Sequence, residues 1–236
     1  MSLRSICFAV CDEIGWTRPT QIAASTEALG RQLLALAKRE LEFISSERDW
    51  PVLLRTHDFD TVAAQDEYDL PDDYDKILSA SVYNSDSYYR LRGSVSPSEW
   101  AQRKYAMLNS IDRYSFRLIG NPLKLVITPT PTLVESLTYE YKTNMRAATD
   151  AGVEKTQYEI DTDVPLVHEK LVQQGLLWRA KRAKGLAYDE EYVEYQNVVK
   201  TRYAQDLVSG VINIGGKPYG SDVVTTGSIP ENGFGS

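Results

Sequence analysis

Five acidic side chains lie within residues 67–77, "EYDLPDDYDKI". They belong to Glu67, Asp69, Asp72, Asp73 and Asp75. Carboxylates this close together could bind a metal ion, and a pair of them could act as the acid and base of a glycosidase. A calcium loop, however, has acids at alternate positions, a glycine at the sixth position and a glutamate at the twelfth, and this stretch lacks that pattern.

A turn accounts for the same residues. The Pro71 ring removes a backbone donor and forces Leu70 toward extended geometry, so a strand that holds Tyr68 must end there. Asp72 and Asp73 can then hydrogen-bond to their own backbone, as turn residues do. We therefore predict a solvated strand-to-turn segment, and keep a metal site or a glycosidase-like carboxylate pair as the alternative.

Other motifs with chemical potential are incomplete. The "DTD" at 161–163 precedes "VPLVHEKL" and is typical of a helix N-terminus, where acidic side chains satisfy free amides. His168 has no serine or cysteine motif to partner it, so we expect a surface histidine. "NIGGKPYG", 213–220, lacks the earlier glycine and the Ser or Thr after lysine that a phosphate loop needs. Nucleotide binding is therefore not expected.

Cys7 and Cys11 are the only cysteines, and both histidines are far from them in sequence. Free cysteine packs as a small hydrophobe, whereas a metal site would need further ligands nearby. We predict buried, inert thiols in a reducing compartment, with a metal site as the alternative, and expect no cofactor.

The one dense basic cluster is "WRAKRAKG", 178–185. At 100° per residue, Arg179 and Arg182 lie 60° apart on a helix, and so do Lys181 and Lys184, but the two pairs point to different sides. This arrangement suits two separate contacts. The four residues are interpreted either as a solvated helix face or as contacts to another subunit, in which arginine would pair with carboxylates.

Composition excludes several classes of protein. The 236 residues are 42% hydrophobic and 25% charged, as in an ordinary globular protein. The net charge of -7 is spread along the chain, and no basic segment indicates sequence-specific DNA binding. The longest apolar run, "ICFAVC", is too short for a signal peptide or a membrane span.

Hydrophobic periodicity predicts the elements that must position these residues. Apolar spacing predicts helices over 3–14, 26–46, 164–184 and 189–209, with Gly185 ending the third. Alternation predicts at least five strands between them. The strands are expected at 53–59, 78–84, 115–120, 123–127 and 137–143. In the last two of these the alternation predicts half-buried strands, with Lys124 and Val126 of the first and Lys142 of the second on the outward face.

The expected fold class is α+β. Neither helical half offers much core alone, so we expect residues 1–50 and 148–209 to form one discontinuous helical domain, a bundle, with an antiparallel β-domain inserted at 51–147. Residues 210–236 contain many glycines and little to bury, so they are expected to form an extended arm.

Several phrases, taken in order, resemble the head-to-tail adaptor, or connector, proteins of short-tailed bacteriophages. The most specific parts are the Tyr-x-Leu-Pro-x-Asp turn and the Leu-x-x-x-Gly-Leu-x-Trp-Arg helix, and the likeness covers about residues 27–195. The phrases are "RELEFISSERDWPVL", "QDEYDLPDDYDKI", "SPSEW", "LKLVITPTP", "YEYKTN", "DTDVPL" and "LVQQGLLWRAKRAKGLAYDEEY".

The resemblance implies a structural virion protein without chemistry of its own, made and assembled in the host cytoplasm. Its copies would form a ring, a dodecamer by the resemblance, below the portal protein and above the tail nozzle or tail tube proteins. Genomic DNA would pass through without sequence-specific binding, and no membrane is involved. The alternative from another class is a carbohydrate- or peptidoglycan-degrading tail enzyme, which the acidic stretch would serve.

In the ring interpretation the arm also makes contacts. Ordering a glycine-rich segment costs roughly 1 to 2 kcal/mol per residue, more than its few apolar side chains offset within one subunit. An outside surface must supply the rest, and "VINI" could add as a strand to an exposed sheet edge. The expected subunit or portal contacts of the arm are Val211, Ile212, Ile214 and Tyr219.

Overall fold

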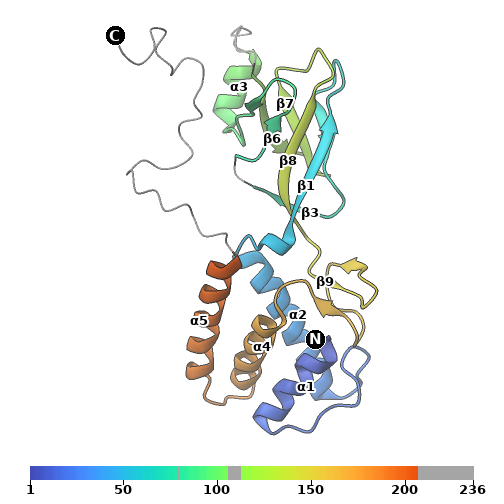
Figure 1. Cartoon of the computed structure of the whole chain (residues 1–236), viewed down its shortest axis with the longest axis vertical. Coiled ribbons are helices and arrows are strands. Elements are labelled where there is room, and N and C mark those ends of the chain that lie inside the picture. The colour runs from blue at the N-terminus through green and yellow to red at the C-terminus, as the bar shows by residue number, and fades with distance from the viewer. Residues whose placement is uncertain (79, 106–112, 207–236) are drawn as a thin grey trace, which may run out of the picture.

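The computed structural model describes residues 1–78, 80–105 and 113–206. Helices and antiparallel strands follow one another along this chain (Figure 1), which confirms the α+β class. The helices are α1 (Leu3–Ile14), α2 (Ala28–Glu47), α3 (Pro97–Tyr105), α4 (Glu169–Ala183) and α5 (Asp189–Asp206), with a short 3₁₀ turn, η1 (Pro51–Leu53). The predicted arm, 210–236, lies outside the described residues.

Helix α1 has the bounds that the sequence predicts, because both of its ends are capped. The Ser2 side chain accepts a hydrogen bond from the Ser5 amide at the start. At the end Gly15 adopts φ 78°, a left-handed conformation that glycine reaches without strain. Gly185, with φ 72°, follows the end of α4 in the same way.

Four helices, α1, α2, α4 and α5, share one cluster of buried side chains. Leu33, Ala37 and Ile44 of α2 belong to it, as do Leu171 and Leu176 of α4. Helix α4 has α5 on one side and α1 with most of α2 on the other (Figure 1). Its buried residues therefore lie on more than one face, and only residues at its ends reach solvent freely.

The largest sheet is built around β8 (Ser136–Thr143), which pairs with β1 (Leu54–Asp60) along its whole length. On its other edge β8 pairs with two short strands, β3 (Tyr74–Ile77) and β4 (Tyr83–Asn84), and β4 continues to β5 (Tyr89–Arg90). The predicted alternation holds for Leu137, Tyr139 and Tyr141, which are buried, but it fails at the end of the strand, where Lys142 and Thr143 are buried as well.

A second sheet runs β2 (Glu67–Asp69), β7 (Lys124–Thr128), β6 (Ser115–Ile119). Aromatic side chains join the two sheets: the Phe59 ring lies 5.1 Å from that of Tyr68 and 6.1 Å from that of Tyr139, between ring centroids. The prediction that β7 has one solvated face was wrong. Val126 points away from this core but is buried against Trp100 of α3.

Two other predicted elements need correction. A strand over 78–84 was too long, since only Tyr83–Asn84 is a strand there and residue 79 lies outside the described residues. The third predicted helix begins at Glu169 instead of 164. Residues Val164–Pro165 form β11, which with β9 (Ala147–Ala148) and β10 (Glu154–Lys155) makes a small third sheet.

Candidate interaction surfaces

The acidic stretch is a turn, as predicted. Strand β2 ends before Pro71, and the Tyr74 amide donates to the Pro71 carbonyl at 3.0 Å before β3 continues. Asp73 accepts a hydrogen bond from the Tyr141 hydroxyl at 2.8 Å. The ammonium group of Lys124 lies 3.6 Å from Asp69. The carboxylates thus face different partners: Asp73 binds Tyr141, Asp69 lies near Lys124, and the others face solvent. Across the described ranges, no three His, Cys, Asp or Glu side chains lie close enough together to hold a metal ion.

The "DTD" segment does not cap a helix, which corrects the prediction. Asp161 instead accepts hydrogen bonds from the Ile22 and Ala23 amides, the latter at 2.6 Å. Asp163 is buried and accepts from the Glu159 and Ile160 amides at 2.7 and 2.9 Å. Asp161 thus ties the loop before α2 to the loop before β11, a long-range role that local spacing does not reveal, whereas Asp163 stabilises the second loop internally.

Burial alone would raise the pKa of Asp163. The Ile160 and Glu159 amides and the Lys155 ammonium group outweigh burial and hold that pKa below its usual value. His168 takes the capping role expected of the acids: its ring nitrogen accepts from the Lys170 amide at 3.2 Å. It is exposed, as predicted.

The cysteines are buried thiols, as predicted, and neither forms a disulfide. Burial raises the pKa of Cys7 to about 12, and the nearby Cys11 adds to that shift. Since the thiolate is the reactive form, neither side chain is set up for nucleophilic chemistry.

The basic cluster on α4 does make two separate contacts, but both are within the chain. Arg179 is only 8% exposed and forms an ion pair with Glu40 of α2, so the assumption that it reaches solvent was wrong. Lys181 pairs with Glu191 of α5. Only Arg182 and Lys184 are left exposed, and Lys184 lies over the Trp16 ring at 5.7 Å.

Glu40 is the centre of a buried polar network that the sequence did not indicate. Its carboxylate accepts from the Tyr195 hydroxyl of α5 at 2.6 Å as well as from Arg179. Burial raises the pKa of Glu40, while Arg179 and Tyr195 oppose that shift. Gly175 of α4 lies directly against the carboxylate, where a Cβ atom would overlap it. Three helices therefore meet at one carboxylate, whose partners fix their positions.

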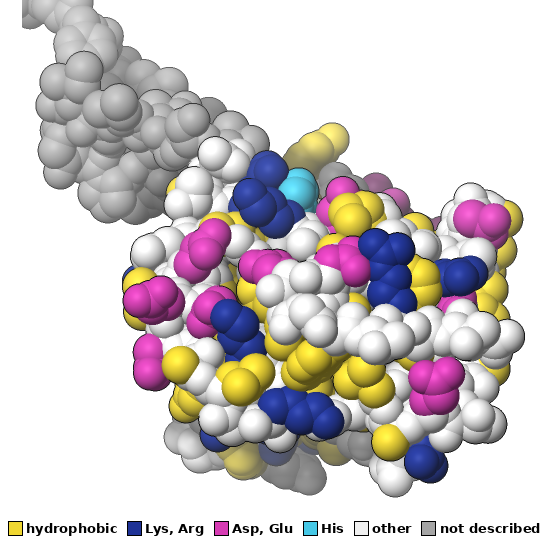
Figure 2. Space-filling view, turned by 90° about the horizontal axis from the view of Figure 1, so that it is seen from below, with side chains coloured by type: hydrophobic (Ala, Val, Ile, Leu, Met, Phe, Trp, Pro, Cys, Tyr) yellow, Lys and Arg dark blue, Asp and Glu magenta, His cyan; other side chains and the backbone are white. Residues whose placement is uncertain are grey.

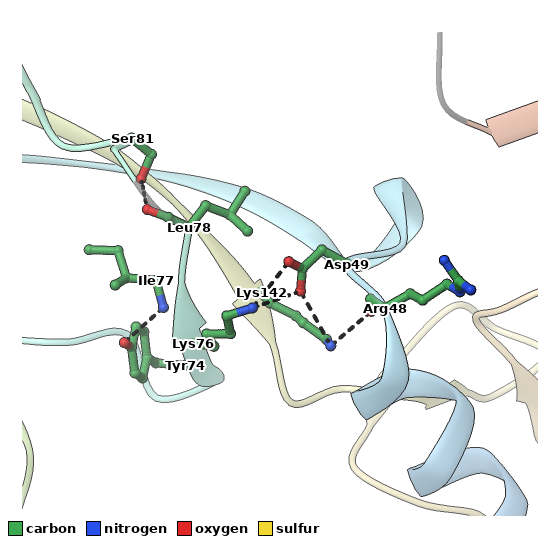
Figure 3. A network of polar contacts seen from close by, with 8 residues as sticks. All are labelled: Arg48, Asp49, Tyr74, Lys76, Ile77, Leu78, Ser81 and Lys142. Atoms are coloured by element: carbon green, nitrogen blue, oxygen red, sulfur yellow. Dashed lines mark hydrogen bonds and ion pairs between the residues drawn. The ribbon is translucent and has the colours of Figure 1, made fainter. Parts of the chain in front are cut away.

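A second polar network joins the end of α2 to the large sheet (Figure 3). Lys142 of β8 donates to the Arg48 carbonyl at 3.0 Å and lies 3.7 Å from Asp49, which also binds Lys76 of β3 at 3.1 Å. The Lys142 side chain is 4% exposed, so its expected outward position was wrong: residues of the linker cover it. Burial lowers the pKa of Lys142, and Asp49 opposes that shift.

Two cavities flank Trp100, with volumes of about 310 and 260 Å³. Both are lined by Asp66, Trp100 and Lys104. This shared lining offers one carboxylate, one ammonium group and an aromatic ring, which suits binding better than nucleophilic catalysis. A base with a nucleophile beside it is the arrangement that acyl transfer requires.

The lower end of the molecule shows hydrophobic side chains between scattered charges of both signs (Figure 2). Large apolar side chains exposed around the α4–α5 loop include Leu186, Tyr192 and Val193. Such a mixture is compatible with contact to another protein but is equally typical of ordinary protein surfaces. In the chain as described, no helix is both long and apolar enough to cross a membrane.

The comparison with known families identifies the class. The family model described as SU10 adaptor protein matches residues 1–214, most of the chain. The chain therefore belongs to the SU10 adaptor protein family, and the resemblance to phage head-to-tail adaptors is confirmed. No curated protein matches it.

Membership makes the protein a structural adaptor of a phage and a component of the virion. The family is one of structural proteins and not of enzymes, which disfavours the alternative of a carbohydrate- or peptidoglycan-degrading enzyme. The predicted contact residues Val211, Ile212, Ile214 and Tyr219 lie outside the described residues.

Proposed function

We propose that the protein forms a ring at the head–tail junction, joins the portal to the tail and lines the channel through which DNA leaves the capsid. The observation that carries this proposal is the family match over residues 1–214. The dodecameric state, assembly in the host cytoplasm and the tail nozzle or tail tube proteins as partners are part of the same proposal. Genomic DNA passes without sequence-specific binding, and the net charge of -7 limits adhesion to phosphates.

We further propose that the chain divides as the sequence predicts, into a discontinuous helical domain at 1–50 and 148–209, a β-domain at 51–147 and an arm at 210–236. The helical cluster of buried side chains and the aromatic cluster between the sheets support this division. The polar contacts of Lys142 with Arg48 and Asp49 join the end of α2 to the large sheet between these two clusters (Figure 3).

The proposed contacts to other subunits or the portal are Arg182 and Lys184, together with Val211, Ile212, Ile214 and Tyr219 of the arm. Lys181 can form such a contact only if its ion pair with Glu191 breaks. Arg179 is not proposed as a contact, because its guanidinium group pairs with Glu40 inside the chain. Truncation after Ser209 should leave a folded protein that fails to join the portal.

Virions made without the protein test the function. Electron microscopy of negatively stained particles should show heads that contain DNA but carry no tails, and supplying the intact gene in trans should restore tails. Particles with normal tails in the absence of the protein would refute the proposal.

A further inference from the structure

Helix α2 carries a basic outer face. At 100° per residue, Arg31 and Lys38 lie 20° apart and point away from the side that buries Leu33 and Ile44, with Arg39 on their flank. Arg31 and Arg39 are exposed and Lys38 is partly exposed. Within the residues that the structure describes, none of the three forms an ion pair.

Helix α5 carries an acidic outer face. Glu190 and Glu194 lie 40° apart on the side away from the buried Val199, and Val193, which is 60° from Glu190 on its other flank, is 59% exposed. These residues line a shallow groove of about 470 Å³. Neither glutamate forms an ion pair with a described residue, and Glu194 accepts only from the Gln174 amide, at 2.9 Å.

The two faces lie on different sides of α4, and both helices run in the same direction from the lower end of the molecule (Figure 1). At 1.5 Å per residue, the α2 cations lie about 4 to 17 Å from its first residue, and Glu190 and Glu194 lie about 1 to 8 Å from the start of α5. Further along, Glu42 of α2 stands at about 21 Å and Lys200 of α5 at about 17 Å. The α2 face is therefore basic over its first three turns and the α5 face acidic over its first two, while Lys200 stands as far along α5 as Arg39 does along α2, so the complementarity is confined to the beginning of each helix.

We propose that the outer face of α5 docks onto the basic face of α2 in a second copy of the chain. The proposal rests on the ring function proposed above and names the contact that would build the ring. Two different faces that meet head to tail leave each copy able to bind one neighbour on either side, so copies add in succession, and the assembly closes into a ring when the rotation between neighbours divides a full turn. Ala35, small and placed among the α2 cations, leaves room for the exposed Val193.

Cross-linking tests the geometry. The double variant Ala35→Cys/Val193→Cys should give a ladder of covalent multimers with a short bis-maleimide when it is assembled on purified portal rings. Each single variant should give no ladder, because one engineered thiol cannot extend the chain of links and Cys7 and Cys11 are buried. A ring that forms without a ladder from the double variant counts against the contact.

Charge reversal tests the chemistry. Arg31→Glu/Arg39→Glu alone, or Glu190→Lys/Glu194→Lys alone, should lower the ring yield about ten-fold or more, since like charges would face each other. Combining both pairs in one chain should restore the ring. Asp58→Lys/Asp60→Lys, exposed on β1, is the matched control and should have no effect.

The outcomes separate the two proposals. Normal rings from every reversal variant overturn the α2–α5 contact and leave the adaptor function standing. If reversal on α2 weakens only DNA retention or ejection while rings form, DNA is the partner of the basic face and the contact is likewise overturned. If the unaltered protein forms no ring on the portal, both proposals fail.

Discussion

A glycine and a carboxylate meet where α2, α4 and α5 pack together. Gly175 has no Cβ, and the Glu40 side chain occupies the space that one would fill. Glu40 cannot move aside freely, because it accepts from Arg179 and from the Tyr195 hydroxyl in a buried site. The requirement for glycine at this position is therefore a matter of space and not of backbone conformation.

Replacement of Gly175 by Ala gives the first prediction. Ala favours a helix interior over Gly by roughly 0.5–1 kcal/mol, yet overpacking against Glu40 should cost about 1–3 kcal/mol, so the free energy of unfolding should fall. Urea denaturation measures this difference. In a Glu40→Ala/Arg179→Met background the carboxylate that a Cβ atom would meet is absent. There Gly175→Ala should leave the free energy of unfolding unchanged or raise it. Destabilisation of equal size in both backgrounds would contradict this explanation.

Asp163 makes stability depend on acid pH. Its pKa is held below the usual value of about 3.9, so its contribution to stability is complete above that value and is lost as the pH falls through the lower, folded-state pKa. Asp163→Asn should lower the free energy of unfolding by about 1–3 kcal/mol near neutral pH, and the difference from the unaltered protein should shrink below about pH 4. Asp60→Asn on the exposed edge of β1 serves as the control. Parallel stability curves for the Asp163 variant and the unaltered protein would rule out the linkage.

At the scale of elements, the sequence predicts what local pattern and capping determine. The bounds of α1 follow from Ser2 and Gly15, and the alternation in β8 follows from one buried face. Val126 and Lys142 were misplaced because their cover comes from distant segments, α3 in one case and the α2–β1 linker in the other. The alternation of apolar and polar residues along a strand does not indicate which distant segment will cover its second face.

The residues predicted to make contacts were also misjudged where their partners are distant in sequence. Arg179 is typical of a solvated basic cluster when only its neighbours in sequence are considered. Its partner Glu40 is 139 residues away and appears in an ordinary amphipathic helix. The capping role assigned to "DTD" was wrong for a similar reason, because Asp161 binds the Ile22 and Ala23 amides from a distant loop.

The junction between α2 and the large sheet yields the prediction at this scale. Asp49→Ala would leave the buried Lys142 ammonium group with only the Arg48 carbonyl, and should lower the free energy of unfolding by about 1–3 kcal/mol. Lys76→Gln removes the more exposed partner of the same carboxylate and should cost about 0–1 kcal/mol. Hydrogen exchange should show faster opening at residues 140–143 in the Asp49 variant. Equal, small effects of the two substitutions would mean that the network does not hold the sheet to the helix.

At the scale of the whole molecule, the surface suits contact with other proteins. Charges of both signs and exposed apolar side chains are interspersed at the lower end (Figure 2). The buried side chains form separate helical and aromatic clusters. In the proposed function, an adaptor needs more than one contact surface, since it would bind its neighbours and two further assemblies at once.

The most direct test of the adaptor function is the native mass of the complex that the purified protein forms with purified portal rings. We predict a single major species in which many copies of the chain are bound to one portal ring in a fixed ratio, a dodecamer if the family resemblance holds for stoichiometry. Portal rings that remain unbound, or that bind a single copy in variable amounts, would contradict the account.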